Sequence, residues 1–540
     1  MKNSAKIGLF LSIFTLTACS IPPLDSSISS LASLSSTSEE ISSSSSEESS
    51  NHSGESSNIS ESISSIEDNT FDLDFYAIND LHGRITSSSY REPGISKIKT
   101  HLDNLKAKNE DGFIFLNSGD LWQDTYESMM NKGECLTKAM DLMGCEALTL
   151  GNHEFDWGID NIKYNRSIAG DVTFLGANIF NYDENLNQIT AHADDICDSY
   201  KIITRGNTKI GIIGIIGKDQ ITSITSSIWE NLSFVDPTNL VKNISHDLKV
   251  NQGCDLVVLS SHASIYGNES MFEEFAQIDN ATNRPYIDLG FCAHSHRNEC
   301  EVFNGVPFLQ GYCHGEMMSH INIKFDGYNY TYSYQNSYFD NTLASDEEMD
   351  ELINSYLTPE FIEDKNVIVG SFSNVNGSSI SRTYAGRLLA YATYEKLSSD
   401  YDIDVVINNG GRNSLYFVGN NQVSKEGVFN ALPFTNYTYI AEVQGKDIYN
   451  ECVDYTNPYY APNPINVTYY DTTIYRVAVI DYLLLHKSTS RRYNYFSTYS
   501  GTPLYIDDQY SYELMWDYLK NNSPFNFNVL YGDEFANINS

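Results

Sequence analysis

Short apolar runs alternate with amphipathic stretches over most of residues 70–535. Five runs have the length of buried strands: Phe71–Asn79, Phe113–Asn117, Ala147–Leu150, Ile210–Ile216 and Leu256–Leu259. Between several of these runs apolar residues recur at three- and four-residue spacing, which predicts helices, as at Ile95, Ile98, Leu102 and Leu105. Strands that alternate with helices favour an α/β layered domain, in which ligands gather at the carboxyl ends of the strands.

The pattern changes near residue 345. Ser345 and Glu348 have the spacing of a capping box. One helical face follows and ends before Pro359; it consists of Met349, Leu352, Ile353 and Tyr356. We therefore predict a first domain over residues 70–344 and a linker helix over 345–365. A second, smaller α/β domain is expected over 366–535, with strand and helix patterns at Asp404–Ile407 and Ile474–Leu485.

The first residues have the features of an export signal. Lys2 and Lys6 precede an apolar stretch, Ile7–Leu16. The following Leu16-Thr17-Ala18-Cys19 resembles a bacterial lipobox, which implies a signal peptide over residues 1–19 and lipidation of Cys19. The alternative is an ordinary signal peptide cleaved near Ala18. Because no later segment approaches the roughly 20 apolar residues of a membrane span, we expect an exported protein that is lipid-anchored to the outer face of the bacterial cytoplasmic membrane.

Residues 20–69 are rich in serine with scattered glutamate. Such a composition buries too little apolar surface to offset the entropy of ordering, so this segment is expected to be a disordered, hydrated tether.

The charge balance limits the classes of partner. The chain has 33 basic and 71 acidic residues and a net charge of −38. A surface of this sign repels polyanions, so no nucleic-acid polymer is expected as a partner. A small anionic substrate remains compatible with the composition if bound metal ions cancel its charge locally.

Eight cysteines follow Cys19: Cys135, Cys145, Cys197, Cys254, Cys292, Cys300, Cys313 and Cys452. Export would permit disulfides, but there is no CxxC pair and most of these cysteines have apolar neighbours. The sequence favours buried free thiols and leaves disulfide pairing open.

Five short polar blocks each follow an apolar run. They are Asp80-Leu-His82-Gly83, Gly119-Asp120, Gly151-Asn152-His153-Glu154, Ser261-His262 and His294-Ser295-His296. Carboxylate, carboxamide and imidazole ligands suit two neighbouring divalent metal ions. A carboxylate has two oxygens, so Asp120 is the candidate for a shared ligand. Any one block alone is typical of a solvated loop or a core histidine, but their joint occurrence at strand ends favours a metal centre.

Charge counting is consistent with a phosphate substrate. Two divalent ions bring four positive charges, and Asp80 with Asp120 return two negative ones. The remaining charge matches a phosphate-monoester dianion. Paired metals also activate water for attack on such esters.

The five blocks, with the longer run Gly151-Asn152-His153-Glu154-Phe155-Asp156-Trp157-Gly158, resemble the calcineurin-like metallophosphoesterase signature. With a second domain, the chain resembles the 5′-nucleotidase family, which includes UDP-sugar hydrolases and 2′,3′-cyclic phosphodiesterases. The resemblance implies a four-layer β-sandwich flanked by helices.

The same resemblance implies roles for individual residues. One metal would take Asp80, His82, Asp120 and His296. The other would take Asp120, Asn152, His262 and His294. His153 would be the catalytic imidazole and Asp156 its partner. The two ions would be zinc, manganese or similar.

The substrate side of the resemblance lies in the second domain. The loop Asn408-Asn409-Gly410-Gly411-Arg412 implies contacts from Asn409, Gly411 and Arg412, and the segment Leu432–Asn436 implies base contacts from Phe434 and Asn436. Arg382 and Arg387 fall where family arginines contact phosphate, and Tyr482 is the candidate for a second stacking ring. Ordinary core packing is the alternative for Phe434 and Tyr482. The family's Gly-Gly-Asp is replaced here by His486-Lys487-Ser488, which leaves base specificity open.

The expected function is extracellular, metal-dependent removal of phosphate from nucleotides, with nucleoside 5′-monophosphates as first choice. The catalytic alternatives are a cyclic-nucleotide phosphodiesterase, a pyrophosphohydrolase or UDP-sugar hydrolase, and a non-nucleotide phosphatase. A non-enzymatic alternative is a nucleotide-binding surface lipoprotein. The expected partner is a small-molecule nucleotide, and the oligomeric state stays open.

Overall fold

A computed structural model describes residues 70–88, 91–224, 228, 231–326, 330–450, 459–461, 467–468, 470–485, 496, 499–506 and 509–531. They lie in one compact unit, Glu67–Ser540. Several predicted features lie outside the described residues: the signal peptide with Cys19, the serine-rich tether, Cys452 and the run His486-Lys487-Ser488.

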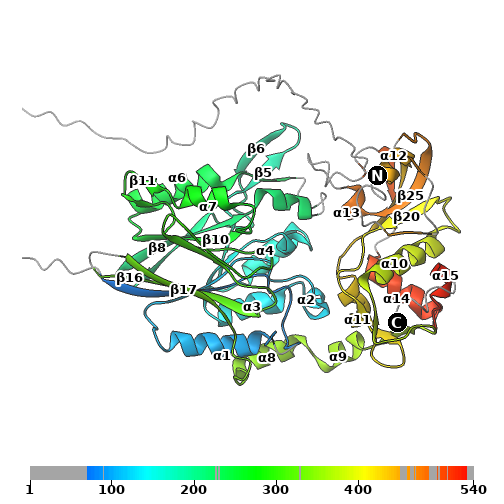
Figure 1. The fold of residues 1–540 in the computed structure, drawn as a ribbon, viewed down its shortest axis with the longest axis horizontal. Coiled ribbons are helices and arrows are strands. Elements are labelled where there is room, and N and C mark those ends of the chain that lie inside the picture. Colours follow the sequence, from blue (N-terminus) through cyan, green and yellow to red (C-terminus); the bar gives the residue numbers. More distant parts are fainter. Residues whose placement is uncertain are drawn as a thin grey trace, which may run out of the picture. The chain divides into compact units, whose positions relative to one another are not determined.

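Two six-stranded sheets form the first part of the described chain (Figure 1). One has the order β17-β16-β1-β2-β3-β4, from β1 (Phe71–Ile78), β2 (Phe113–Asn117), β3 (Cys145–Thr149), β4 (Thr173–Leu175), β16 (Met317–Phe325) and β17 (Tyr330–Tyr338). The other has the order β14-β15-β13-β10-β8-β7, from β7 (Tyr200–Arg205), β8 (Thr208–Ile216), β10 (Leu256–His262), β13 (Leu289–Phe291), β14 (Glu299–Phe303) and β15 (Val306–Gln310). All five predicted apolar runs fall on these strands, with ends that differ by at most three residues.

Four strands of each sheet run parallel. In the first sheet these are β1, β2, β3 and β4. In the second they are β8, β10, β13 and β15. The other strands pair antiparallel. Parallel strands bring their carboxyl ends to the same edge, so the loops that follow them meet there.

Side chains along β1 alternate between two cores, as the pleat of a strand requires. Phe75 packs with Ile210 and Val258 of the other sheet, so the two sheets enclose one apolar layer between them. The next residue, Tyr76, belongs instead to the core beneath the helices. Burial on both faces explains why the parallel strands read as continuous apolar runs.

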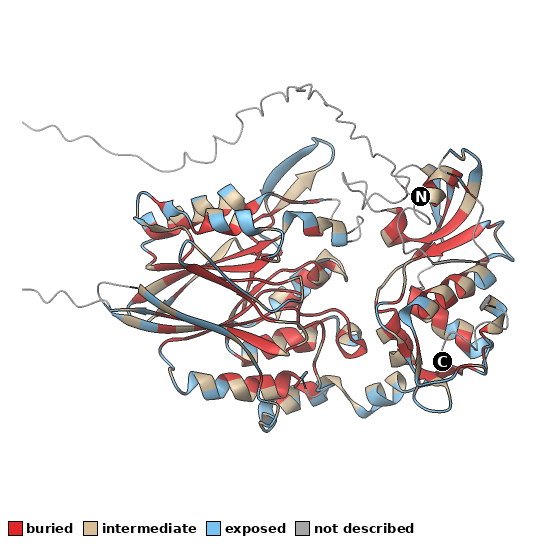
Figure 2. Ribbon diagram, viewed as in Figure 1, coloured by how far each residue is buried: buried red, intermediate tan, exposed pale blue. Residues whose placement is uncertain are grey.

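Helices cover the outer faces of both sheets. The first sheet packs against α1 (Ile95–Lys106), α3 (Glu134–Leu142) and α4 (Ile159–Ser167). The second packs against α6 (Pro237–Val250) and α7 (Glu269–Phe275). Figure 2 shows the strands mostly buried and the helices exposed along their outer faces. The predicted α/β class and its helix-sheet-sheet-helix layering are confirmed.

A second group of elements follows residue 366. Its five-stranded sheet has the order β24-β20-β25-β23-β26, from β20 (Val405–Asn408), β23 (Thr438–Gln444), β24 (Tyr459–Ala461), β25 (Ile474–Ile480) and β26 (Tyr499–Tyr505). A separate core, with Leu388, Phe429 and Met515, lies among its helices. These are α10 (Arg382–Leu397), α11 (Lys425–Ala431) and α14 (Ser511–Asn521). The domain division at residues 344 and 366 stays a prediction.

The predicted single linker helix is wrong in detail. The segment forms two helices, α8 (Glu347–Tyr356) and α9 (Pro359–Lys365). Pro359 ends the first pattern and begins the second helix, where its missing N–H is no loss. The cap of α8 is Asp346 rather than Ser345, because the Asp346 side chain accepts a hydrogen bond from Met349 N.

The described cysteines are free thiols. Cys135, Cys145, Cys197, Cys254 and Cys292 are buried, as predicted. Cys300 is exposed and Cys313 is partly buried, so the prediction of burial is wrong for these two. None of the helices in the described part of the chain has the length and hydrophobicity of a membrane span.

Candidate metal centre and catalytic site

The polar blocks gather at the edge where the two sheets end. Asp80 and His82 follow β1, Asp120 follows β2 and Asn152 follows β3. From the second sheet, His262 ends β10, and His294 and His296 follow β13. The parallel pairing of β1 with β2 and β3, and of β10 with β13, brings these segments together.

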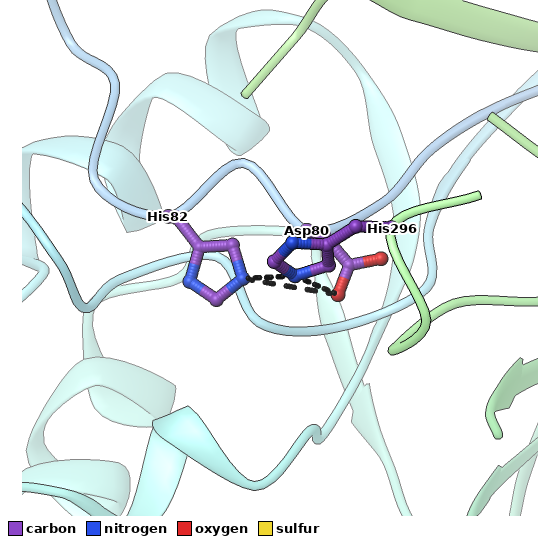
Figure 3. A group of neighbouring side chains, drawn as sticks. All are labelled: Asp80, His82 and His296. Atoms are coloured by element: carbon purple, nitrogen blue, oxygen red, sulfur yellow. Dashed lines mark hydrogen bonds and ion pairs between the residues drawn. The ribbon is translucent and has the colours of Figure 1, made fainter. Parts of the chain in front are cut away.

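One group of side chains consists of Asp80, His82 and His296 (Figure 3). The two imidazole Nε2 atoms lie 2.8 Å apart. Asp80 Oδ1 lies 3.5 Å from His296 Nε2 and 3.9 Å from His82 Nε2. Three ligand atoms that converge in this way form one face of a coordination shell.

A second group consists of Asp120, His262 and His294, and a third of His82, Asp120 and His153. Asp120 Oδ2 lies 3.1 Å from His262 Nε2 and 3.9 Å from His82 Nε2. One carboxylate oxygen therefore lies between imidazoles that belong to different groups. Such a position suits a ligand shared between two ions.

Neighbouring groups fix the orientation of the rings. His82 Nδ1 lies 3.3 Å from Gln123 O, and His262 Nδ1 lies 2.9 Å from Ser118 O. Each ring can donate Nδ1–H to that carbonyl and present the Nε2 lone pair to a cation. Burial lowers the pKa of His82 far below its ordinary value and, with His262 nearby, that of His294 to about 4, so these two rings are neutral. Burial also disfavours the charged forms of His262 and His296, but Asp120 and Asp80 outweigh it and raise their pKa values to about 9 and about 10, so a metal ion would displace a proton from each.

The residues present fit divalent metal ions. Asn152 Oδ1 is buried and has no hydrogen-bond partner among the described residues. An unsatisfied buried acceptor destabilises a folded protein by about 1–3 kcal/mol. A cation at this edge would satisfy that oxygen.

The backbone is also unusual at the candidate ligands. Five of them have a left-handed backbone, which costs about 1–3 kcal/mol for a residue with a side chain. Their φ angles are 49° at Asp80, 50° at His82, 51° at Asp120, 79° at His294 and 54° at His296. Backbone strain concentrated at five candidate ligands is typical of a functional site.

Glu154 holds the centre together, and its role was missed in the sequence. Its buried carboxylate accepts hydrogen bonds from the backbone N–H groups of Asp120 (2.9 Å), Leu121 (2.8 Å) and Gly151 (2.7 Å). It thereby ties the loop after β2 to the loop after β3. Burial, together with Asp120, raises the pKa of Glu154 to about 7. The position of Glu154 within the Gly151–Gly158 block was the sequence feature that could have indicated this role.

Asn79 and His314 were also missed. Asn79 Nδ2 donates to Asp80 Oδ2 (2.6 Å) and to the carbonyl oxygen of Tyr312 (2.7 Å). Asp80 also accepts from His294 N at 2.9 Å, which joins the two sheets at the centre. His314 places its ring 5.8 Å from that of His82 and forms an ion pair with Glu92 at 3.3 Å. Neither residue lies in one of the five polar blocks, so the sequence pattern did not single them out.

The imidazole ring of His153 lies next to the candidate metal ligands His82 and Asp120. Its Nδ1 lies 2.7 Å from Asp156 Oδ2, which leaves Nε2 directed to the centre. Burial disfavours the charged ring, but Asp156 and Asp120 outweigh burial and raise the pKa of His153 to about 9. The ring is therefore a cation near neutral pH, able to donate a proton.

A cavity of about 770 Å³ leads away from the centre. Asp120, Asn152 and His294 line it together with other residues of the first part of the chain, such as Lys132 and Ile228, and residues of the second group of elements line the remainder. Five of the predicted substrate residues line it: Asn409, Arg412, Phe434, Asn436 and Tyr482. Trp157 and Asp481, which were not predicted, line it as well.

Three other predicted substrate residues do not line this cavity. Arg382 is exposed at the start of α10, and Arg387 is partly buried one turn later. Gly411 N donates to the carbonyl oxygen of Arg382 at 3.1 Å, so both residues shape the loop that carries Arg412.

Comparison with known proteins bears on this site. Residues 73–298 match the family model of the calcineurin-like phosphoesterases. Over 437 residues the chain is 23% identical to the 5′-nucleotidase of Vibrio cholerae, covering 72% of this chain and 76% of that protein. Residues 73–298 are therefore similar to the calcineurin-like phosphoesterases, and the longer match is to 5′-nucleotidases. The chain is a divalent-metal-dependent hydrolase of phosphate esters.

Solved structures share the fold of this metallophosphoesterase. A 5′-nucleotidase precursor from Thermus thermophilus aligns with a TM-score of 0.64 at 17% identity, over 84% of this chain and 96% of that one. The structure of a protein from Staphylococcus aureus that is named only provisionally as a 5′-nucleotidase gives the same TM-score and identity, over 84% of this chain and 98% of that one. At this identity the likeness concerns the fold.

The contacts of Glu154 predict a loss of metal affinity in Glu154→Gln. An amide nitrogen cannot accept an N–H, so at least one loop loses its anchor and the ligands lose their alignment. We expect Mn²⁺ binding to weaken about 10- to 100-fold, measured by calorimetric titration of the metal-free protein. Glu110→Gln, an exposed matched change, should bind as the unaltered protein does. Equal affinity in the two variants would contradict the role of Glu154.

Proposed function

We propose that this hydrolase removes phosphate from nucleotides, with nucleoside 5′-monophosphates as its first substrates. The observation that carries the proposal is the single cavity of about 770 Å³ with the ligand cluster at one end and two aromatic rings, Phe434 and Tyr482, along it. A phosphate bound at the cluster would leave its nucleoside among these rings. The 5′-nucleotidase activity named for the relatives supports the same choice.

Two divalent cations are proposed for the centre. One would be held by Asp80, His82, Asp120 and His296. The other would be held by Asp120, Asn152, His262 and His294. When bound, such ions neutralise the phosphate and lower the pKa of water so that it attacks phosphorus.

His153 is proposed to give its proton to the oxygen that leaves phosphorus. Its support is the contact with Asp156, which holds Nδ1 at 2.7 Å and stabilises the cation. Arg412 lines the same cavity, and its charge acts against protonation of His153, so the two cations are near each other. Arg412 would orient the phosphate by hydrogen bonds to its oxygens.

The nucleoside is proposed to stack between Phe434 and Tyr482, with Asn436 as a hydrogen-bonding neighbour. Hydrogen bonds between the loops of the candidate metal centre and the segments that carry Phe434 and Tyr482 support this placement of the nucleoside. Gln123 Nε2 donates to the carbonyl oxygen of Pro433, and Thr435 Oγ1 donates to the carbonyl oxygen of Asp156 at 3.4 Å. Tyr482 Oη lies 3.5 Å from Thr222 O.

Loss of the catalytic groups tests the reaction. His153→Ala should lower kcat for AMP about 10²- to 10⁴-fold, the usual share of an acid catalyst. Asp120→Asn should abolish measurable phosphate release, because the shared ligand loses its charge. The matched control is His246→Ala, since His246 also pairs with a carboxylate, Asp279, at 2.8 Å. Turnover in both site variants equal to that of the control, by free-phosphate detection, would sink the proposal.

The aromatic rings are tested by their preference for a base. Phe434→Ala should lower the ratio of kcat/KM for AMP to that for ribose 5-phosphate about tenfold or more, since base stacking contributes about 1–3 kcal/mol. Tyr334→Ala, at an exposed ring, should leave the ratio as it was. If Phe434 only packs a core, the variant will melt at a lower temperature with an unchanged ratio.

We also propose that the enzyme acts outside the cell, tethered by a lipid on Cys19. The support is the run Leu16-Thr17-Ala18-Cys19 after an apolar stretch. In a bacterial host, Cys19→Ala should abolish incorporation of labelled fatty acid and release the protein from the membrane fraction, whereas Cys300→Ala should change neither. Labelling that persists in Cys19→Ala would overturn the anchor.

A further inference from the structure

A second cavity, of about 1040 Å³, lies beside the metal centre. It is formed by the turn Gly217–Ser223 after β8, the start of α6 and the loop between β10 and α7. We call it the distal cavity. Two residues, Ser223 and His294, line both this cavity and the one that leads to Phe434 and Tyr482. The two cavities therefore meet at a proposed metal ligand.

The turn Gly217–Ser223 separates the two spaces. On one side the carbonyl of Thr222 lies 3.5 Å from the hydroxyl of Tyr482. On the other side the whole turn lines the distal cavity. A group bound at His294 thus has a path on each side of this turn.

Inside the distal cavity one buried polar atom has no partner. Gln220 is 6% exposed and lines the cavity, and its Oε1 makes no hydrogen bond. Gly217 leaves room for this amide, since a Cβ there would lie 3.0 Å from Gln220 Nε2. A buried acceptor of this kind calls for a donor from a bound molecule, such as a hydroxyl group.

The charges of the wall exclude a second phosphate. Lys218 is paired with Asp236 at 2.7 Å, and Glu274 is paired with Lys242 at 2.8 Å. Asp219 and Glu273 add two further acidic side chains to the lining. The rest of the wall combines hydroxyls and amides, including Ser264 and Asn268, with apolar side chains such as Phe234 and Met271. Such a surface suits an uncharged, hydroxylated group.

We propose that the distal cavity binds the second substituent of a phosphodiester, an uncharged polyhydroxylated alcohol such as a glyceryl or glycosyl group, joined through one phosphorus to a nucleoside 5′-oxygen. This inference rests on the proposed function, because it places the nucleoside in the aromatic cavity. A monoester leaves the distal cavity empty of substrate, whereas a diester extends one arm into each cavity. The enzyme is then a phosphodiesterase as well as a phosphomonoesterase.

The position of His153 decides which bond breaks. His153 lines the aromatic cavity and is not among the residues of the distal one. Water oxygen therefore bonds to phosphorus while the bond from phosphorus to the 5′-oxygen breaks, and His153 protonates that oxygen. The products are the free nucleoside and the phosphomonoester of the second alcohol. The water supplies the hydroxyl on phosphorus, and its other proton restores His153.

The test compares three substrates that differ only at the phosphate: AMP, its methyl ester and its glyceryl ester. Both esters carry one charge, so they differ only in the alcohol, methyl or three-carbon glyceryl, that reaches the distal cavity. We expect kcat/KM for the glyceryl ester to exceed that for the methyl ester about tenfold or more. Chromatography of the reaction mixture should show adenosine and glycerol phosphate appearing together as the first products.

Gln220→Met is the decisive variant. Methionine has a similar size and no amide acceptor, so the preference for glyceryl over methyl should fall about tenfold. Its melting temperature should stay equal or rise, because an unpaired buried acceptor is removed. Gln252→Met, an exposed glutamine outside both cavities, is the matched control and should keep the preference.

The outcomes separate this inference from the proposed function. Hydrolysis of AMP without hydrolysis of either diester overturns the diester site and leaves the nucleotidase standing. AMP and glycerol as first products also overturn it, since they would place glycerol on the side of His153. An equal rate for both diesters, or a preference unchanged in Gln220→Met, overturns the role of the distal cavity. Failure to hydrolyse all three substrates overturns both proposals.

Discussion

The carboxylate of Asp120 lies between imidazoles brought by two different sheets, 3.1 Å from His262 Nε2 and 3.9 Å from His82 Nε2. Everything else at the site is arranged around that position. A buried carboxylate is costly unless it is paired and hydrogen-bonded. The sandwich meets this cost by placing the ends of β1, β2, β3, β10 and β13 at one edge, where their loops supply partners.

Glu154 is the second constraint. A buried carboxylate that accepts three backbone N–H groups holds the loops after β2 and β3 in one conformation. That restraint helps maintain the left-handed backbone at Asp120, which a free loop would relax. Gly151 belongs to the same arrangement, because a side chain there would collide with Asp120 Oδ1. The hydrogen-bonded centre lies between two cavities, of about 770 Å³ and about 1040 Å³.

The two cavities give the enzyme a division of labour. In the proposed mechanism, the candidate metal ligands and His153 would act on phosphorus, which is common to every phosphate ester, while the cavity walls would contact the groups that the phosphorus carries. Aromatic rings suit a base, and hydroxyls with amides suit an uncharged alcohol. Substrate range in such an enzyme depends on the walls, which lie on loops and on the second group of elements, and these vary more easily than the strand ends.

Much of the site was legible in the sequence because the candidate metal ligands are polar residues placed directly after apolar runs. Asp80, His82, Asp120, Asn152, His262, His294 and His296 were named from that pattern, and the structure brings them to one edge of the sandwich. Five of the strands were predicted to within three residues, since burial on both faces leaves a continuous apolar run.

Other features depended on tertiary structure. The distance between Asp80 and His294 depends on how two sheets pack, and a hydrogen bond from His294 N to Asp80 Oδ2 at 2.9 Å joins segments 214 residues apart. The sequence predicted Ser345 as the cap of α8, but Asp346 caps it, because the local backbone geometry selects one of two adjacent polar side chains. Which arginines line the substrate cavity depended on the path of the Asn408–Arg412 loop. The sequence by itself determined the chemistry available at each strand end; only the packing of the sheets decided which of those groups share one space, because separation along the chain carries no information about proximity across a fold.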